Sequence, residues 1–81
     1  MTKQELKKIS HYINHAREEK DYLFLKETVE IKSENLIFLF YSNDKTKSFE
    51  VVRIDKDEDM FKVLNVEEIE ALIKIIKEYN V

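Results

Sequence analysis

Glycine and proline are both absent from this chain of 81 residues, although average proteins contain about 7% and 5% of them. Turns must therefore be made by other residues, with Asn and Asp standing where glycine often serves. Phosphate-cradling loops, dinucleotide fingerprints and nucleophile elbows all need glycine, because their backbone must approach a ligand closely or adopt positive φ. The sequence thus excludes the familiar forms of nucleotide-dependent chemistry.

The chain has room for one small domain. Apolar residues make up 43% and charged residues 38%, which is too hydrophobic for a disordered tail. There is no cysteine, so disulfides and thiolate metal sites are excluded. The longest apolar run, residues 36–41, is far shorter than the roughly 20 residues that span a bilayer, and residues 1–20 lack the apolar core of a signal peptide. We expect a cytoplasmic protein without a membrane partner and without a cofactor.

Hydrophobic periodicity predicts helices over about 3–19 and about 66–79. Each range carries an apolar stripe at helical spacing, and each opens with the spacing of a capping box. The stripes consist of Leu6, Ile9, Ile13 and Ala16 in the first range, and of Ile69, Leu72, Ile73, Ile76 and Tyr79 in the second. The capping pairs are Thr2 with Glu5 and Asn65 with Glu68.

The middle of the chain predicts strands over about 22–31, 36–42 and 48–54, with a short fourth strand over about 60–64. Residues 36–41 are apolar at every position, which is typical of a central strand covered on both faces. The apolar positions of the third strand change face midway, which indicates a β-bulge. The predicted fold is therefore a single α+β domain, in which an antiparallel meander is packed by an N-terminal and a C-terminal helix.

These strands offer more apolar side chains than two helices on one side can cover. If both helices pack on the same face, the other face exposes an aromatic patch, and such a patch marks an interaction site. We predict that this partner or dimer interface contains Phe24, Phe38 and Phe40. In the alternative arrangement each helix covers one face, and the strand edges remain open to a partner strand or to a second copy of the chain.

Acidic residues gather in the last third of the chain. Residues 55–70 carry seven acidic and two basic side chains. Clustered carboxylates on a rigid domain can occupy a basic groove of another protein. We predict a partner-binding surface that consists of Asp55, Asp57, Glu58, Asp59, Glu67 and Glu68. The alternative is a solvated loop followed by a solvated helix start.

The first helix supports a second hypothesis. Its predicted exposed face carries Lys7, Lys8, His11, His15 and Arg17. Such a face could lie along phosphates, but the net charge of the whole chain is −3, whereas dedicated nucleic-acid binders are usually basic. His11 and His15 also have the spacing of a metal-binding pair. We expect them to be solvated and expect no metal site.

Catalytic constellations are not found. Ser10 and His11 are neighbours on a helix and point in different directions, so they cannot form a nucleophile–base pair. Glu27 falls at an inward position of the first strand, where a buried carboxylate would be a candidate acid. A local bulge that turns Glu27 outward is the interpretation we favour. We therefore predict that the chain is not an enzyme.

Together these features favour a small non-enzymatic protein-binding module. In size, acidity and lack of glycine the chain resembles phage and mobile-element inhibitor proteins, anti-CRISPR proteins among them. The resemblance implies an inhibitor that occupies a basic or apolar surface of a partner protein. The alternatives are a nucleic-acid-binding regulator and a homo-oligomeric structural or assembly protein.

Overall fold

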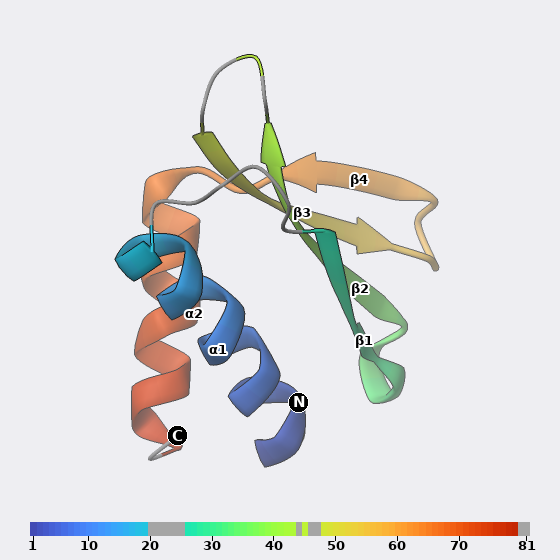
Figure 1. Cartoon of the computed structure of the whole chain (residues 1–81). Coiled ribbons are helices and arrows are strands. Elements are labelled where there is room, and N and C mark those ends of the chain that lie inside the picture. The colour runs from blue at the N-terminus through green and yellow to red at the C-terminus, as the bar shows by residue number, and fades with distance from the viewer. Residues whose placement is uncertain (20–25, 44, 46–47, 80–81) are drawn as a thin grey trace.

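The computed structural model describes residues 1–19, 26–43, 45 and 48–79. In chain order the elements are α1 (Lys3–Glu19), β1 (Lys26–Ile31), the short 3₁₀ helix η2 (Lys32–Glu34), β2 (Leu36–Asn43), β3 (Ser48–Asp55), β4 (Met60–Val63) and α2 (Val66–Glu78) (Figure 1). This order confirms the predicted α+β fold. Residues 22–25, which we predict to belong to the first strand, lie outside the described residues.

The sheet is an antiparallel meander in the order β1-β2-β3-β4. Strand β2 pairs with β3 without interruption, from Leu36 opposite Asp55 to Asn43 opposite Ser48. The predicted bulge in the third strand is therefore wrong. The apolar positions of β3 change face because the strand is apolar on both faces, with Val51 on one and Val52 on the other.

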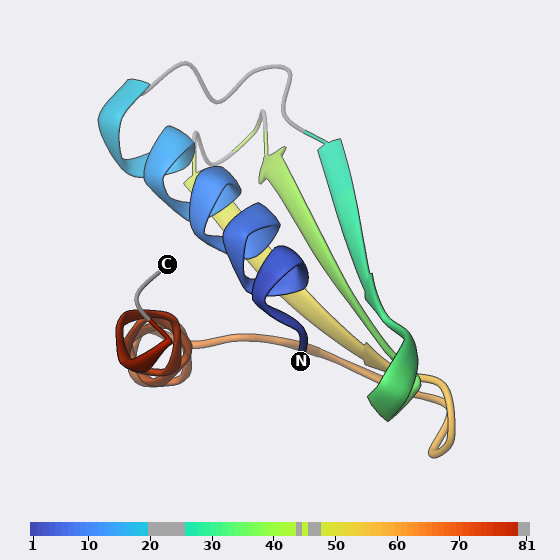
Figure 2. The ribbon, with the colours of Figure 1, turned by 90° about the horizontal axis from the view of Figure 1, so that it is seen from below.

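Both helices pack on the same face of the sheet, which we name the inner face (Figure 2). Side chains from the two helices and from β1, β2 and β3 form one buried cluster. Its members are Leu6, Ile9, Ile13, Val29, Ile31, Leu36, Phe38, Phe40, Val51, Leu72 and Ile76. Phe40 is fully buried at the centre of this cluster, and its ring centroid lies 5.5 Å from that of Tyr12. The fold thus has two layers, one of helices and one of strands.

Each helix begins with the predicted capping box. The Asn65 side chain accepts a hydrogen bond from the backbone N–H of Glu68 at 2.8 Å, and the Glu68 carboxylate accepts one from the N–H of Asn65 at 3.2 Å. Thr2 and Glu5 exchange the same two bonds at the start of α1, at 2.6 and 3.1 Å. These bonds satisfy backbone donors that have no partner within the helix.

Two turns adopt the left-handed backbone conformation without glycine. Asn35 has φ 53° and Asp59 has φ 51°, and Asn and Asp tolerate this region better than other residues with a Cβ atom. The Asn35 side chain donates a hydrogen bond to the Asp57 carboxylate at 2.6 Å, and the Asn35 carbonyl accepts one from the Lys56 N–H at 3.1 Å. The turn before β2 and the turn before β4 therefore support each other.

Candidate functional site

The face of the sheet that points away from the helices, which we name the outer face, is apolar. Leu39 stands opposite Val52, and Ile37 stands opposite Ile54. Directly opposed residues of antiparallel strands point to the same face, so these two pairs form the centre of the surface. Its apolar residues are Ile37, Leu39, Tyr41, Val52, Ile54, Phe61 and Val63.

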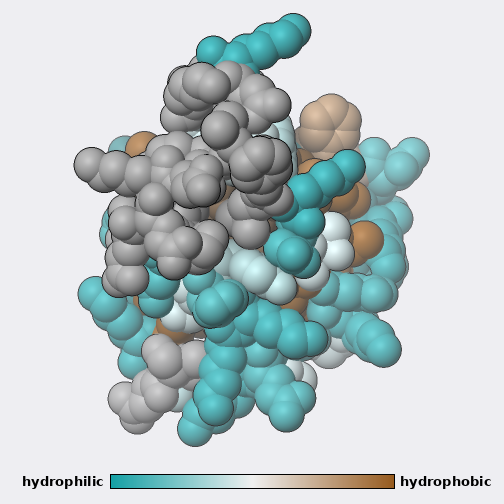
Figure 3. Space-filling view, viewed as in Figure 1, coloured by the Kyte–Doolittle hydropathy of each residue, from teal (hydrophilic) through white to brown (hydrophobic). Residues whose placement is uncertain are grey.

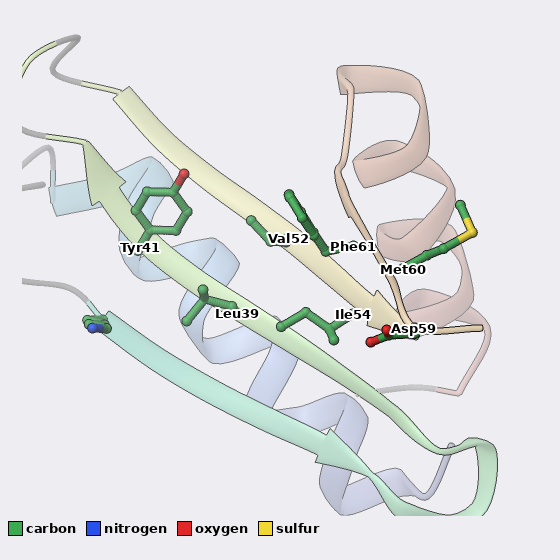
Figure 4. Close-up of a pocket in the computed structure, with 8 residues that line it drawn as sticks. Leu39, Tyr41, Val52, Ile54, Asp59, Met60 and Phe61 are labelled. Atoms are coloured by element: carbon green, nitrogen blue, oxygen red, sulfur yellow. The ribbon is translucent and has the colours of Figure 1, made fainter. Parts of the chain in front are cut away.

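The outer face holds a shallow depression of about 510 Å³, lined by Leu39, Tyr41, Val52, Ile54, Met60 and Phe61, with Lys26 and Asp59 as its charged members. Figure 4 shows Leu39, Tyr41, Val52, Ile54 and Phe61 along the face of the strands that points away from the helices, with Asp59 and Met60 at the end of the sheet. Phe61 is 76% exposed, Leu39, Tyr41 and Ile54 are half-buried, and Val52 between them is buried at 7%. Met60, which is 60% exposed, lies at the end of the depression. In the space-filling view, hydrophobic residues reach the surface over β3 and β4 (Figure 3). Exposed apolar patches of a few hundred Å² are typical of interaction sites in other proteins, which makes the outer face the candidate site.

Polar and charged groups border the outer face. The Tyr41 hydroxyl donates a hydrogen bond to the Glu50 carboxylate, and this bond raises the pKa of Tyr41 because it holds the proton on the phenol. The Lys56 ammonium contacts Glu30 at 3.0 Å. Lys26 makes no ion pair with another described residue. The surface therefore combines an apolar centre with a polar rim, which is the composition of protein–protein interfaces.

Phe38 and Phe40 belong to the opposite face and require a correction. They are 3% and 0% exposed in the core between the sheet and the helices, so they are not available to a partner. Phe24, the third predicted aromatic residue, lies outside the described residues. Because β2 is apolar on both faces, its own pattern does not tell which set of side chains the helices cover.

The signal that identifies the covered face lies in β1. Val29 and Ile31 are buried, whereas Thr28 and Glu30 between and beside them are exposed. Val29 stands opposite Phe38, so the alternation of β1 places Phe38 on the covered face and Leu39 on the open one. Sequence reasoning missed Leu39, Ile54 and Phe61 because it did not carry this alternation across the hairpin.

The residues Asp55 to Asp59, which we name the acidic turn, connect β3 to β4 at one end of the outer face. The Asp55 carboxylate accepts hydrogen bonds from the N–H groups of Asp57 and Glu58 at 3.0 and 3.2 Å. Asp57 in turn accepts the bond from Asn35. Two of the four predicted carboxylates thus hold the turn together, while Glu58 and Asp59 are exposed.

The two predicted acidic residues of α2 lie in its first turn. The Lys62 ammonium contacts the Glu68 carboxylate at 2.8 Å. That contact, with the hydrogen bond from the Asn65 backbone, lowers the pKa of Glu68 below its ordinary value of 4.5. Glu68 is therefore used within the fold, whereas Glu67 is exposed. Neither residue lines the depression of the outer face.

The basic face of α1 lies apart from the outer face. Lys7, Lys8 and His11 are exposed on the helix, and the His11 ring packs edge-on against Tyr12 with centroids 5.5 Å apart. The side chains of His15 and Arg17 lie outside what the structure describes. Nucleic-acid binding by this face stays a prediction.

Titratable groups of the described residues lie at the surface. No polar or charged residue among them is buried, and they form no group of three or more potential metal ligands. Glu27 stands opposite Phe40 in regular register and is exposed. The predicted bulge at Glu27 is therefore wrong, and the carboxylate reaches solvent because β1 is an edge strand. Among the described helices, none is long and apolar enough to cross a membrane.

Comparisons of this chain with the known protein families, with curated proteins and with solved structures give no match.

Proposed function

We propose that this chain is a protein-binding module that uses the outer face of its sheet to cover an apolar surface of another protein. One observation carries the proposal: both helices pack on the inner face, and the opposite face of the same strands is also apolar. Leaving that face in water is unfavourable by roughly 25 cal/mol for each Å² of apolar surface. A partner that covers it gains this free energy.

The composition of the outer face supports a protein as the partner. Aromatic residues are enriched at protein interfaces, because they bury a large area and lose little side-chain entropy. Phe61 projects into solvent from β4, and Tyr41 combines a ring on the outer face with a hydroxyl bound to Glu50. The depression is broad and shallow, which suits a complementary protein surface.

The acidic turn indicates the chemistry of the partner. Asp59 is exposed and lines one end of the depression, and Glu58, the residue before it, is also exposed. Their field attracts a partner whose apolar surface is bordered by Lys or Arg residues. A module that covers such a surface inhibits the partner where that surface is itself a binding site. We therefore propose that the chain inhibits a partner by covering such a binding site.

Affinity capture from a host lysate tests the proposal. We expect the wild-type protein to retain a partner that the Ile54→Glu variant does not retain, because the substitution places an unpaired carboxylate at the centre of the buried surface. Val66→Glu is the matched control, since Val66 is 74% exposed at the start of α2 and does not line the depression. Equal retention by all three proteins would contradict the proposal.

A further inference from the structure

We propose that, when no partner is bound, the outer face is covered by a second copy of the chain. The two copies form a two-fold symmetric dimer in which Lys26 of each copy faces Asp59 of the other. This inference rests on the proposed function, because it requires the outer face to be a binding surface. Beyond the proposed function, it states that a second copy of the chain competes with the partner for the outer face, and it states which residues of the two copies meet.

The charge distribution of the outer face supports this geometry. Lys26 and Asp59 both line the depression. Lys26 begins β1 opposite Tyr41, and Asp59 directly precedes Met60, which begins β4 opposite Asp55. The two residues therefore lie on opposite edge strands and at opposite ends of the sheet. Three strand spacings of about 4.8 Å and about five residues of 3.3 Å separate them, a diagonal on the order of 20 Å.

Lys26 and Asp59 thus mark diagonally opposite corners of the outer face, and a two-fold axis can place each of them against the other residue in the second copy. This axis lies between the packed faces and runs perpendicular to the line from Lys26 to Asp59. Each ammonium then meets a carboxylate of the second copy, and the apolar centre around Leu39 and Ile54 meets itself. A two-fold interface must be complementary to itself, and a rim with opposite charges at opposite corners meets this condition. The diagonal makes the strands of the two sheets cross at roughly 90°, which is one of the two preferred sheet-packing angles.

The small size of the outer face indicates a weak dimer. Four strands of about six residues present a surface on the order of 400 Å², so two copies bury on the order of 800 Å². Stable specific interfaces bury about 1,200–2,000 Å². The dimer is therefore weak and dissociates on dilution. A partner with a larger complementary surface displaces the second copy.

Sedimentation equilibrium of the pure protein tests the inference, over about 10 µM to about 1 mM, where an interface of this size associates. We expect reversible dimerisation of the wild type. Lys26→Glu and Asp59→Lys each weaken it by about tenfold or more, because each creates two like-charge contacts. An equimolar mixture of K26E and D59K restores association, because both contacts in the mixed dimer then join opposite charges. An arrangement that pairs position 26 with 26 and 59 with 59 would also associate in the mixture, but there K26E alone would keep two like-charge contacts, as the wild type has, and would not weaken the dimer. The loss in each single variant together with the rescue therefore identifies the pairing of Lys26 with Asp59.

Two further variants separate folding from association. Asp59→Asn removes the charge and keeps a residue that tolerates the positive φ of this position, so it should weaken the dimer without loss of fold. Lys7→Glu reverses an exposed charge on α1 and should leave association unchanged. A wild type that stays monomeric at about 1 mM, or a dimer that K26E does not weaken, would overturn the inference. Either result leaves the proposed function standing, because capture of a foreign partner is measured separately.

Discussion

Individual residues of this protein replace glycine by supplying hydrogen bonds that stabilise the turns. Asn35 and Asp59 occupy the left-handed region, which costs a residue with a Cβ atom about 1–2 kcal/mol in general and less for Asn and Asp. The hydrogen bonds of Asn35 to Asp57 and Lys56 offset part of that cost. Two carboxylates that were predicted from the sequence to bind a partner, those of Asp55 and Asp57, therefore accept hydrogen bonds that stabilise the turn.

At the same scale, Glu68 should make stability depend on pH. Its pKa is lowered in the folded protein by Lys62 and by the Asn65 N–H, so its contribution is present above pH 4.5 and is lost as the pH falls through the folded pKa. Glu68→Gln keeps an acceptor for the Asn65 N–H but does not titrate. We expect this variant to lose less stability than the wild type between about pH 6 and pH 3, measured as urea midpoints. Glu67→Gln is the control, and equal losses in all three proteins would contradict the assignment.

At the scale of the elements, the inner face of the sheet carries side chains that hold the fold together, and the outer face carries side chains that reach solvent. Phe40 is fully buried on the inner side of β2, whereas Phe61 of β4 is 76% exposed. Phe40→Ala should therefore cost about 3–5 kcal/mol of unfolding free energy, and Phe61→Ala less than about 0.5 kcal/mol.

Chemical denaturation measures this difference. Because a chain of this size has only a few kcal/mol of stability, Phe40→Leu provides a milder substitution at the same position. The Phe61→Ala protein, although as stable as the wild type, should bind the captured partner more weakly. Comparable destabilisation by Phe40→Ala and Phe61→Ala would show that the outer face is packed rather than open.

The helices, the strand order and both capping boxes could be predicted from the sequence, because each depends on local spacing. The side of the sheet that α1 and α2 cover could not be predicted from β2, whose apolar residues serve both faces. For this reason the interface predicted from the sequence contains Phe38 and Phe40, which are buried under the helices, and not Leu39 between them, which lies on the outer face. The exposure of Glu58 and Asp59 could be anticipated, but the use of Asp55 and Asp57 as hydrogen-bond acceptors depends on the backbone path of the turn.

At the scale of the whole molecule, the acidic turn adjoins the outer face through Asp59, which lines the depression. The apolar centre is expected to determine how long a complex lasts, and the charges at its end how fast it forms. Glu58→Gln should therefore lower the association rate constant for the captured partner, and more at low salt than at high salt. The dissociation rate constant should change little. Surface plasmon resonance at two salt concentrations measures both constants, and a change confined to dissociation would contradict the electrostatic role of the turn.

The alternation of two apolar sets along β2 also bears on how this protein can change over generations. Substitutions at Leu39 can retune recognition while Phe38 and Phe40 preserve the fold, so new partners can be acquired by single codon changes in a strand that keeps its place. A deletion of one residue within β2 has the opposite effect. It moves the side chains after the deletion to the opposite face of the sheet. The core then loses Phe residues that it needs and the outer face loses its recognition residues, so one mutation abolishes both folding and binding.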